Sequence, residues 1–341
     1  MRVAMYYKNS DVRLEERPVP KIGKGELLVK VMASGICGSD VMEWYRIKKA
    51  PRVLGHEIAG EIAEVGGAVK KFKKGDRVFV SHHVSCGKCR YCLDGHESAC
   101  DTLRATNFDP GGFSEYLRVP EVNVEKGTYL LPDEMSYEDG TFIEPVGCVV
   151  RGQRFARVQK GQTVLVVGSG ISGLMHVQLA KLNGARKVIA TDIIRYRLDA
   201  AKRLGADEVI DAKDDVPGRL LELNNGLPAD RVIVCTGALP AIDQALKSVD
   251  RGGIVLFFAP TEPGVNIPVP LWDIWTNEVS VTTSYAANHS DIIAAIELIR
   301  SSKFKTKEMV THRLGLADAG KGFRLVAEAK DSIKVIIEPQ R

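Results

Sequence analysis

TVLVVGSGISGLMHVQLAKL, residues 163–182, is the stretch that decides the fold of the second half of the chain. Four apolar residues, 164–167, lead directly into three glycines with the spacing G-x-G-x-x-G, and a helix-like segment follows. In a dinucleotide-binding turn the first glycine permits the tight turn, the second admits a pyrophosphate, and the third lets helix and strand pack closely. Glycines that serve only a chain turn are the alternative. The predicted cofactor-binding residues here are Gly168, Gly170, Ile171, Ser172 and Gly173.

The next apolar run, KVIATD, ends at Asp192, which follows the first glycine of the turn by 24 positions. A carboxylate about 20 positions beyond such a turn binds ribose hydroxyls and repels a 2′-phosphate, so NAD is favoured over NADP. Arg195 and Arg197 come just after it and weaken that preference, because a nearby arginine can accommodate the phosphate. Asp192 and Arg197 therefore join the predicted cofactor site.

The distribution of apolar runs along the chain predicts two domains. After residue 150 the apolar runs are continuous, as in RVIVC (231–235), and helix-like sequence separates them, which indicates a parallel sheet between helices. The first 130 residues show short runs punctuated by glycine and proline, which indicate an antiparallel or barrel-like β unit. The pattern then reverts near residue 288, with a helix expected after a Ser290 cap and a final strand expected to return to the first domain.

Four cysteines gather in the loop CGKCRYCLDGHESAC, residues 86–100, with the spacing C-x2-C-x2-C-x7-C. A compact loop of this kind can wrap four sulfurs around one tetrahedral ion, and zinc is the natural occupant. A site with four protein ligands has no open position, so its predicted role is structural. Surface thiols without a metal and an iron–sulfur cluster are the alternatives. The predicted ligands are Cys86, Cys89, Cys92 and Cys100.

A third group is dispersed over GICGSD (35–40), GHE (55–57) and FIEP (142–145). A lone Cys37 is most often a small core side chain, and a lone His56 is most often a hydrogen-bonded structural histidine. Catalytic zinc, in contrast, uses three protein ligands and leaves a fourth position for water or substrate. From the residues alone, a metal role for Cys37 and His56 and a structural role remain equally open.

The chain resembles the zinc-dependent medium-chain alcohol dehydrogenase family over nearly its whole length, because it carries, in chain order, GICGSD, VLGHEIAGEIAEVG, GDRV, the four-cysteine loop, FIEP, VLVVGSGISG and IATD. The similarity is greatest to the polyol (sorbitol-type) and threonine dehydrogenase branches, because Glu144 stands where alcohol dehydrogenases proper carry a third cysteine ligand. The resemblance implies an α/β protein with a GroES-like β domain, 1–150 and 288–341, and an inserted Rossmann domain with a doubly wound parallel sheet, 151–287.

The resemblance also assigns roles at the dispersed site. Cys37 and His56 correspond to ligands of a catalytic zinc, and Glu57 and Glu144 to carboxylates that share or alternate the remaining coordination. Asp40 corresponds to the acid that orients the histidine ligand. With the four-cysteine loop, two zinc ions per chain are expected.

Ser39 corresponds to the hydroxyl that touches the substrate oxygen and passes its proton onward. Polyol enzymes usually carry a histidine three residues later, where this chain has Met42, which cannot relay a proton. Glu43, Tyr45, a cofactor ribose hydroxyl or a chain of water molecules are the possible substitutes.

Charge and composition exclude other classes of function. The 47 basic and 43 acidic residues give a net charge of +4 and are spread along the whole chain, which disfavours nucleic acid and membrane surfaces as partners. We therefore expect a cytoplasmic, NAD-dependent zinc oxidoreductase that acts on a small secondary alcohol or polyol. Oxidation of an amino alcohol, as in L-threonine 3-dehydrogenase, and a catalytically lapsed NAD- and zinc-binding protein are the alternatives. A homotetramer, or else a dimer, is expected through the edge segment 279–286.

Overall fold

The computed structural model describes all residues from Met1 to Arg341 and divides into two compact units. The first unit comprises Met1–Gly147, Ala286–Ser302 and Thr306–Arg341. The second comprises Cys148–Tyr285 and Lys303–Lys305. The domain ranges expected from the sequence, 1–150 with 288–341 and 151–287, differ from these boundaries by a few residues, apart from the short segment at 303–305. No helix in either unit has both the length and the apolar character needed to cross a membrane.

The second unit is built on a six-stranded sheet in the order β11-β10-β9-β12-β13-β14, in which every pair is parallel. The predicted doubly wound parallel sheet is therefore confirmed. Successive strands are added on one side from β9 to β11 and on the other from β12 to β14, so the order switches between β9 and β12, where such sheets bind ligands. The strands are β9 (Thr163–Val167), β10 (Lys187–Asp192), β11 (Glu208–Asp211), β12 (Ala229–Val234), β13 (Val249–Phe257) and β14 (Ser280–Thr283).

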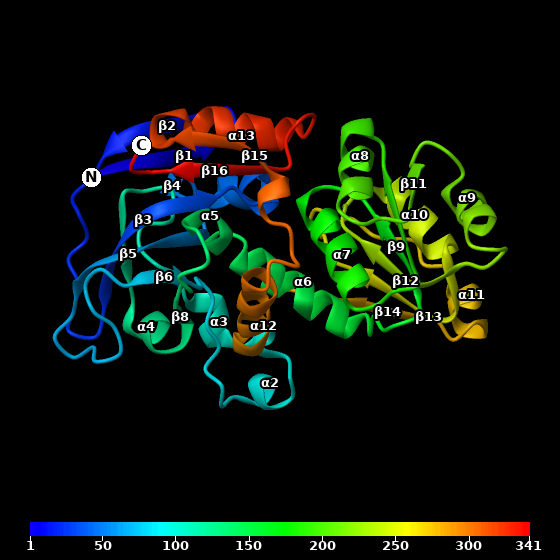
Figure 1. Ribbon diagram of the computed structural model, residues 1–341, viewed down its shortest axis with the longest axis horizontal. Helices are drawn as coiled ribbons and strands as arrows, with labels where there is room; N and C mark the ends of the chain where they lie inside the picture. The colour runs from blue at the N-terminus through cyan, green and yellow to red at the C-terminus, as the bar shows by residue number, and fades with distance from the viewer. The chain divides into compact units, whose positions relative to one another are not determined.

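Helices connect and cover these strands (Figure 1). All five residues of β9 are buried, as are eight successive residues of the helix that follows it, because this strand and helix lie at the centre of the unit. The helices are α6 (Ile143–Phe155), which spans the boundary between the units, α7 (Ile171–Leu182), α8 (Arg195–Arg203), α9 (Val216–Leu223), α10 (Leu239–Lys247) and α11 (Leu271–Thr276).

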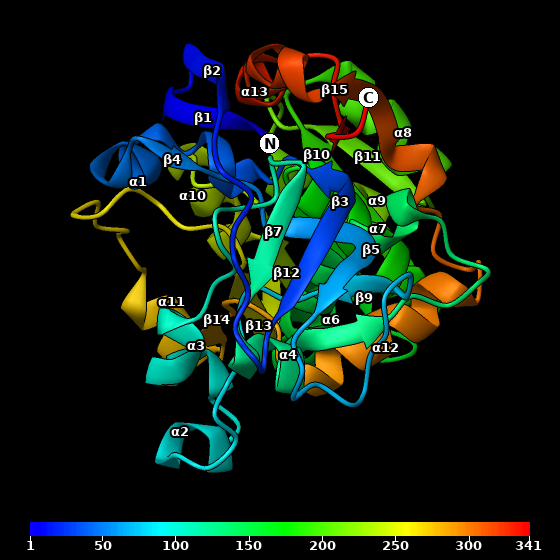
Figure 2. The ribbon, with the colours of Figure 1, turned by 90° about the vertical axis from the view of Figure 1, so that its left-hand side faces the viewer.

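The first unit is a mainly antiparallel β structure. Its larger sheet has the order β15-β16-β3-β5-β6-β8, with β7 also paired to β3, and a smaller sheet has the order β2-β1-β4. Figure 2 shows β7, β3 and β5 side by side. The strands are β1 (Arg2–Lys8), β2 (Asp11–Glu16), β3 (Leu27–Gly35), β4 (Arg52–Val53), β5 (Glu57–Val65), β6 (Arg77–Val80), β7 (Tyr116–Val119), β8 (Thr128–Leu130), β15 (Val310–Gly315) and β16 (Lys334–Glu338).

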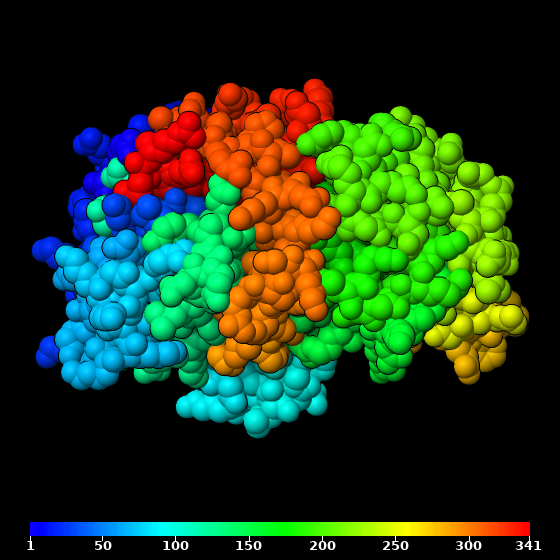
Figure 3. All heavy atoms as spheres, viewed as in Figure 1, coloured from blue at the N-terminus to red at the C-terminus, as the bar shows by residue number.

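The last strand of the chain returns to this unit. Ile336 and Ile337 of β16 pair with Gly35 and Ser34 of β3, and Figure 3 shows the C-terminal residues in red against the N-terminal residues in blue. The unit's helices are α1 (Glu43–Arg46), α2 (Arg90–Leu93), α3 (Asp101–Ala105), α4 (Glu121–Gly127), α5 (Tyr137–Gly140), α12 (His289–Arg300) and α13 (Ala319–Glu328).

The start of α12 differs from the sequence-based expectation. The N-cap is Asn288 rather than Ser290: its side chain accepts a hydrogen bond from the N–H of Asp291, whose carboxylate accepts one from the N–H of Asn288. This reciprocal pair satisfies two of the free donors at the start of the helix, so the asparagine outcompetes the serine two positions later.

Candidate functional site

Two strand ends bring the dispersed residues together. Gly35, the last residue of β3, pairs with Glu57, the first residue of β5, so Cys37 and His56 lie just beyond the same edge of the sheet. One ligand atom from each of Cys37, His56 and Glu57 lies within 4.8 Å of the other two. A thiol sulfur, an imidazole nitrogen and a carboxylate oxygen form a donor set that fits zinc and leaves a fourth position open.

Asp40 lies behind the histidine. It is fully buried in the 3-10 helix η1 (Gly38–Val41), and its Oδ1 is 3.4 Å from Nδ1 of His56. An imidazole that gives its Nδ1 hydrogen to a carboxylate presents Nε2 to a metal. Oδ2 of Asp40 also accepts a hydrogen bond from the N–H of Cys37, at 3.2 Å. One carboxylate therefore orients two of the candidate ligands.

The charges at this site shift the pKa values of both partners. Burial raises the pKa of Asp40, but His56, Arg46 and the N–H of Cys37 outweigh it, so the pKa of this carboxyl is lowered overall. Burial lowers the pKa of His56, but the nearby charges of Asp40 and Cys37 outweigh it and raise the pKa well above its usual range. Each group thus stabilises the charge of the other.

Ser39 is held between the candidate ligands and an arginine. Its N–H and its hydroxyl each lie 3.4 Å from the sulfur of Cys37. Nη2 of Arg46 donates to Oγ of Ser39 at 3.0 Å and to Oδ1 of Asp40 at 3.2 Å. The sequence-based prediction missed Arg46, and its only signal was the basic run RIKKAPR at 46–52.

The two side chains considered as substitutes for the missing histidine have no contact with Ser39 and have other partners. The carboxylate of Glu43 accepts a hydrogen bond from the N–H of Asn9, at 2.8 Å. The ring of Tyr45 lies under the guanidinium of Arg46, 4.7 Å from its centre. An arginine donates but cannot accept a proton, so the contact that Ser39 makes with Arg46 is not a proton relay.

Besides its place among the candidate ligands, Glu57 has a protein partner that the sequence-based prediction also missed. Nζ of Lys334, on β16, donates to Oε2 of Glu57, and both side chains are buried. Gly35 leaves room for this pair, because a Cβ at that position would overlap both side chains. Glu144 is buried in the first turn of α6 and does not belong to the group of ligand atoms around Cys37.

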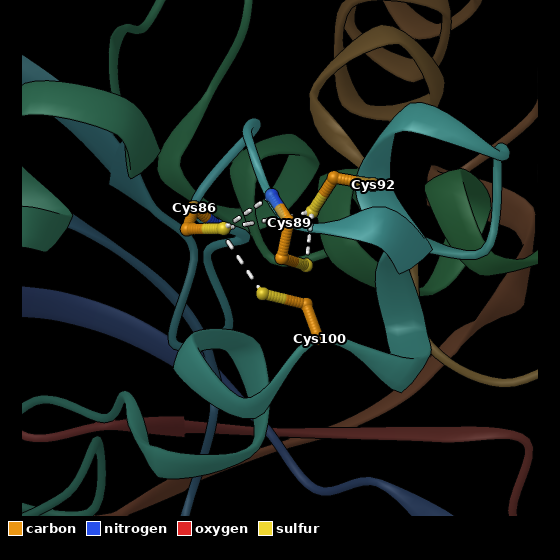
Figure 4. A group of neighbouring side chains, drawn as sticks. All are labelled: Cys86, Cys89, Cys92 and Cys100. Atoms are coloured by element: carbon orange, nitrogen blue, oxygen red, sulfur yellow. Dashed lines mark hydrogen bonds between the residues drawn. The ribbon is translucent and has the colours of Figure 1, made fainter.

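The four cysteines of the 86–100 loop form a separate group. Their sulfur atoms all lie within 4.8 Å of one another and point toward a common centre (Figure 4), and no disulfide joins them. The N–H groups of Lys88 and Cys89 donate to Sγ of Cys86 and lower the pKa of its thiol. Four sulfurs in this arrangement, with backbone donors that favour a thiolate, fit a tetrahedral zinc ion.

In the second unit, the glycine turn has the geometry that a dinucleotide needs. Gly168 has φ +91°, and a Cβ on Gly173 would overlap the carbonyl oxygen of Gly168. A Cβ on Gly170 would have only the guanidinium of Arg197 within 4 Å. Nε of Arg197 is buried without a hydrogen-bond partner, which leaves a cationic donor for an anionic group. Ile171 and Ser172 open α7 at this point.

Asp192, at the end of β10, lies beside this turn. Its two oxygens accept hydrogen bonds from the N–H groups of Ser169 and Ile194, at 2.8 and 2.9 Å. Arg197 lies 3.8 Å from the same carboxylate, whereas Arg195 pairs with Asp199 on the exposed side of α8. Of the two arginines, only Arg197 faces the predicted ribose site.

Comparisons with known proteins cover almost the whole chain. The family model described as "Alcohol dehydrogenase GroES-like domain" matches residues 23–133, and the one described as "Zinc-binding dehydrogenase" matches residues 172–301. The chain is 34% identical to sorbitol dehydrogenase of Bacillus subtilis, with 100% of this chain and 98% of that protein covered. It is 35% identical to L-threonine 3-dehydrogenase of Bacillus licheniformis, with 94% of each covered.

A solved structure is similar over the same extent. A zinc-binding dehydrogenase from Sinorhizobium meliloti 1021, bound to NADP, matches with a TM-score of 0.88 and 28% identity over 99% of each chain.

Proposed function

The chain belongs to the zinc-binding alcohol dehydrogenase family and is a zinc-dependent oxidoreductase that acts on the CH–OH group of alcohols or polyols; within that family, we propose that Cys37, His56 and Glu57 hold its catalytic zinc. The observation that carries the proposal is the gathering of one ligand atom from each of these residues within 4.8 Å. Glu57 is preferred to Glu144 as the standing carboxylate because Glu144 lies outside that group. Cys86, Cys89, Cys92 and Cys100 hold a second, structural zinc.

The chain's own residues position the substrate and its proton. When bound, the catalytic zinc supplies a Lewis acid that lowers the pKa of the substrate hydroxyl. Ser39 contacts the substrate oxygen, and Asp40 keeps the imidazole of His56 oriented through Nδ1. Arg46 donates to Oγ of Ser39 and Glu43 accepts from the N–H of Asn9, so neither side chain takes the proton from Ser39. A bound cofactor would supply a ribose hydroxyl, and solvent a water molecule, as the acceptor.

The dinucleotide that accepts the hydride is NAD. Asp192 keeps a lone pair on each oxygen for a ribose hydroxyl in addition to its two backbone partners, and its charge disfavours a 2′-phosphate. Arg197 offsets part of that charge, so some use of NADP is expected. The ratio of kcat/KM with NAD to that with NADP tests the preference, and a ratio below one would contradict it.

A single set of assays separates the candidate activities. Initial rates with NAD are measured for polyols, simple secondary alcohols and L-threonine, together with the zinc content and the effect of a chelator. NADH formation with a polyol or secondary alcohol, sensitive to the chelator, and about two zinc ions per chain are the expected results. Activity confined to L-threonine would favour oxidation of an amino alcohol. One tightly bound zinc without turnover would favour a catalytically lapsed NAD- and zinc-binding protein.

A homotetramer, or else a dimer, in the cytoplasm is the proposed assembly. β14 is the edge strand of the parallel sheet and is mostly exposed. On α11 of the same unit, Trp272 and Trp275 are 72% and 70% exposed. Open strand edges and large apolar side chains favour association with another copy. Light scattering that shows a stable monomer would contradict this assembly.

A further inference from the structure

A buried lysine contacts one of the proposed ligands of the catalytic zinc. Nζ of Lys334 donates to Oε2 of Glu57, and the side chains of the two residues are 0% and 2% exposed. Lysine is almost never fully buried unless its charge is paired. The carboxylate that is proposed to bind the ion is therefore already in contact with a cation of the protein itself.

The strand pairing keeps open the space in which these two side chains meet. Gly35 of β3 pairs with Glu57 of β5 on one side and with Ile336 of β16 on the other. A Cβ at Gly35 would lie within 2.8 Å of Oε2 of Glu57 and of Nζ of Lys334. Only a glycine at this position leaves room for the pair, so the contact is built into the sheet.

The pairing of Lys334 with Glu57 is exclusive. The ammonium of Lys334 has no other hydrogen-bond or ion-pair partner, and its remaining contact is with the buried ring of Phe142, whose centre lies 5.5 Å from Nζ. The other cation beside the proposed ligands, Arg46, is paired with Asp40. Each of the two buried carboxylates therefore has its own cation without any help from a metal.

A zinc ion at this site would be a second cation on the same carboxylate. Without zinc, Lys334 prevents the charge of Glu57 from being buried without compensation, which would be costly. With zinc, the ion and the ammonium either share the two oxygens of Glu57 or exchange places on them. In both cases two like charges are held close together in a buried site, where their repulsion is strong.

We infer that Lys334 is a positioning residue that takes the place of the catalytic zinc on Glu57 in the metal-free chain and competes with the ion for that carboxylate. The inference rests on the proposed function, because it assumes that Cys37, His56 and Glu57 hold the zinc. It goes beyond a stabilising role for the pair. It implies that Lys334 stabilises the metal-free fold and, through the same contact, weakens the binding of zinc.

Zinc affinity tests this inference. Lys334→Gln removes the charge but keeps a hydrogen-bond donor for the carboxylate. In the full-length protein with zinc retained in the cysteine loop, the Kd of the second zinc is measured by competition with a chelator. We expect Lys334→Gln to lower this Kd by about tenfold or more, because the repelling charge is gone. A lysine that only supported the fold would give the opposite result, since a loosened site binds zinc more weakly.

Two further variants control this measurement. Lys247→Gln removes an exposed lysine that is paired with Asp243 on α10, and it should leave the Kd unchanged. His56→Gln removes a proposed ligand and identifies which of the two ions is measured. If Lys334→Gln leaves the Kd unchanged or raises it, the inference is wrong while the proposed function stands. A parent protein that binds only one zinc, and retains it in His56→Gln, would count against the proposed function.

Thermal unfolding decides the inference even where the metal-free variant is too unstable for a titration. A ligand that binds the variant more tightly than the parent must also offset part of the stability that the variant loses. Lys334→Gln is therefore expected to lower the Tm less with the second zinc bound than without it. A metal-free variant that does not fold, although its zinc-loaded form does, gives the same answer. A loss that is at least as large with zinc as without it would overturn the inference.

Discussion

The two proposed metal sites of the first unit are built in opposite ways. The four cysteines come from one loop of 15 residues, and backbone N–H groups supply much of their electrostatic support. The proposed catalytic group comes from the ends of two strands and has buried charged side chains beside it: Asp40 behind His56, and Lys334 against Glu57. The first site therefore depends on local chain geometry, whereas the second depends on strand pairing and on charge compensation over long sequence distances.

The largest expected effect is the loss of activity when a proposed ligand of the catalytic zinc is replaced. His56→Gln removes a catalytic ligand, so we expect kcat/KM to fall by about a thousandfold or more and the zinc content to fall from about two to about one per chain. His96→Gln, which changes an exposed histidine inside the cysteine loop, is the matched control and should alter neither value. Loss of both zinc ions on changing His56 would show that the sites are not independent.

The second effect concerns charge compensation. In the zinc-free protein, Lys334→Met leaves the carboxylate of Glu57 buried without a cationic partner, and we expect the free energy of unfolding to fall by about 3–5 kcal/mol in denaturant titrations. Changing both residues, Glu57→Gln with Lys334→Met, should recover part of the loss, since no uncompensated charge remains.

Lys247→Met is the control for this pair, because it breaks an exposed pair with Asp243 and should cost no more than about 1 kcal/mol. A loss from Lys334→Met that is as small as the control would mean that the buried pair does not stabilise the fold.

The third effect concerns the cysteine loop. Cys89→Ser removes one of its four ligands, so one zinc is expected to be lost while kcat/KM with a polyol stays within about twofold. A cross-link that closes a loop of about 15 residues is worth about 3 kcal/mol by chain entropy, so the expected loss of stability is about 2–3 kcal/mol. Zinc content and thermal unfolding measure the two outcomes. Complete loss of activity would show that the loop serves the catalytic site.

The smallest expected effect concerns the contact between the cysteine loop and the start of α12. Asn288 caps α12 and also donates to the carboxylate of Glu97 in the loop, at 2.9 Å. Asn288→Ala removes both contacts and should cost about 1 kcal/mol, whereas Asn288→Ser keeps a cap and removes only the contact with Glu97. If both variants lose the same stability, the cap contributes nothing and the contact with the loop accounts for the whole effect.

The contrast between local and dispersed features also explains what the sequence could predict. The glycine turn and the four-cysteine loop are local patterns, so their spacing alone indicated a dinucleotide-binding turn and a metal loop. Cys37 and His56 could be assigned to one site only by resemblance to a family, because the pairing of β3 with β5 that joins them is a long-range contact.

Neither Lys334 nor Arg46 could be assigned to the site from motif spacing. Lys334 meets Glu57 across 277 positions of sequence, and only the pairing of β16 with β3 makes this contact possible. Arg46 lies in the basic run at 46–52, and the short helix α1 brings it against Ser39. Side-chain partners of this kind follow from strand register and loop geometry rather than from motif spacing.

The pairing of Lys334 with Glu57 affects the order in which the first unit folds. These residues are 277 positions apart, and β16 must pair with β3 before the buried carboxylate of Glu57 gains its cation. Until then, the larger sheet lacks both an inner strand and the positive charge of its buried pair. Contacts between distant parts of a chain form later than local ones, so the proposed catalytic site is expected to be completed after the cysteine loop.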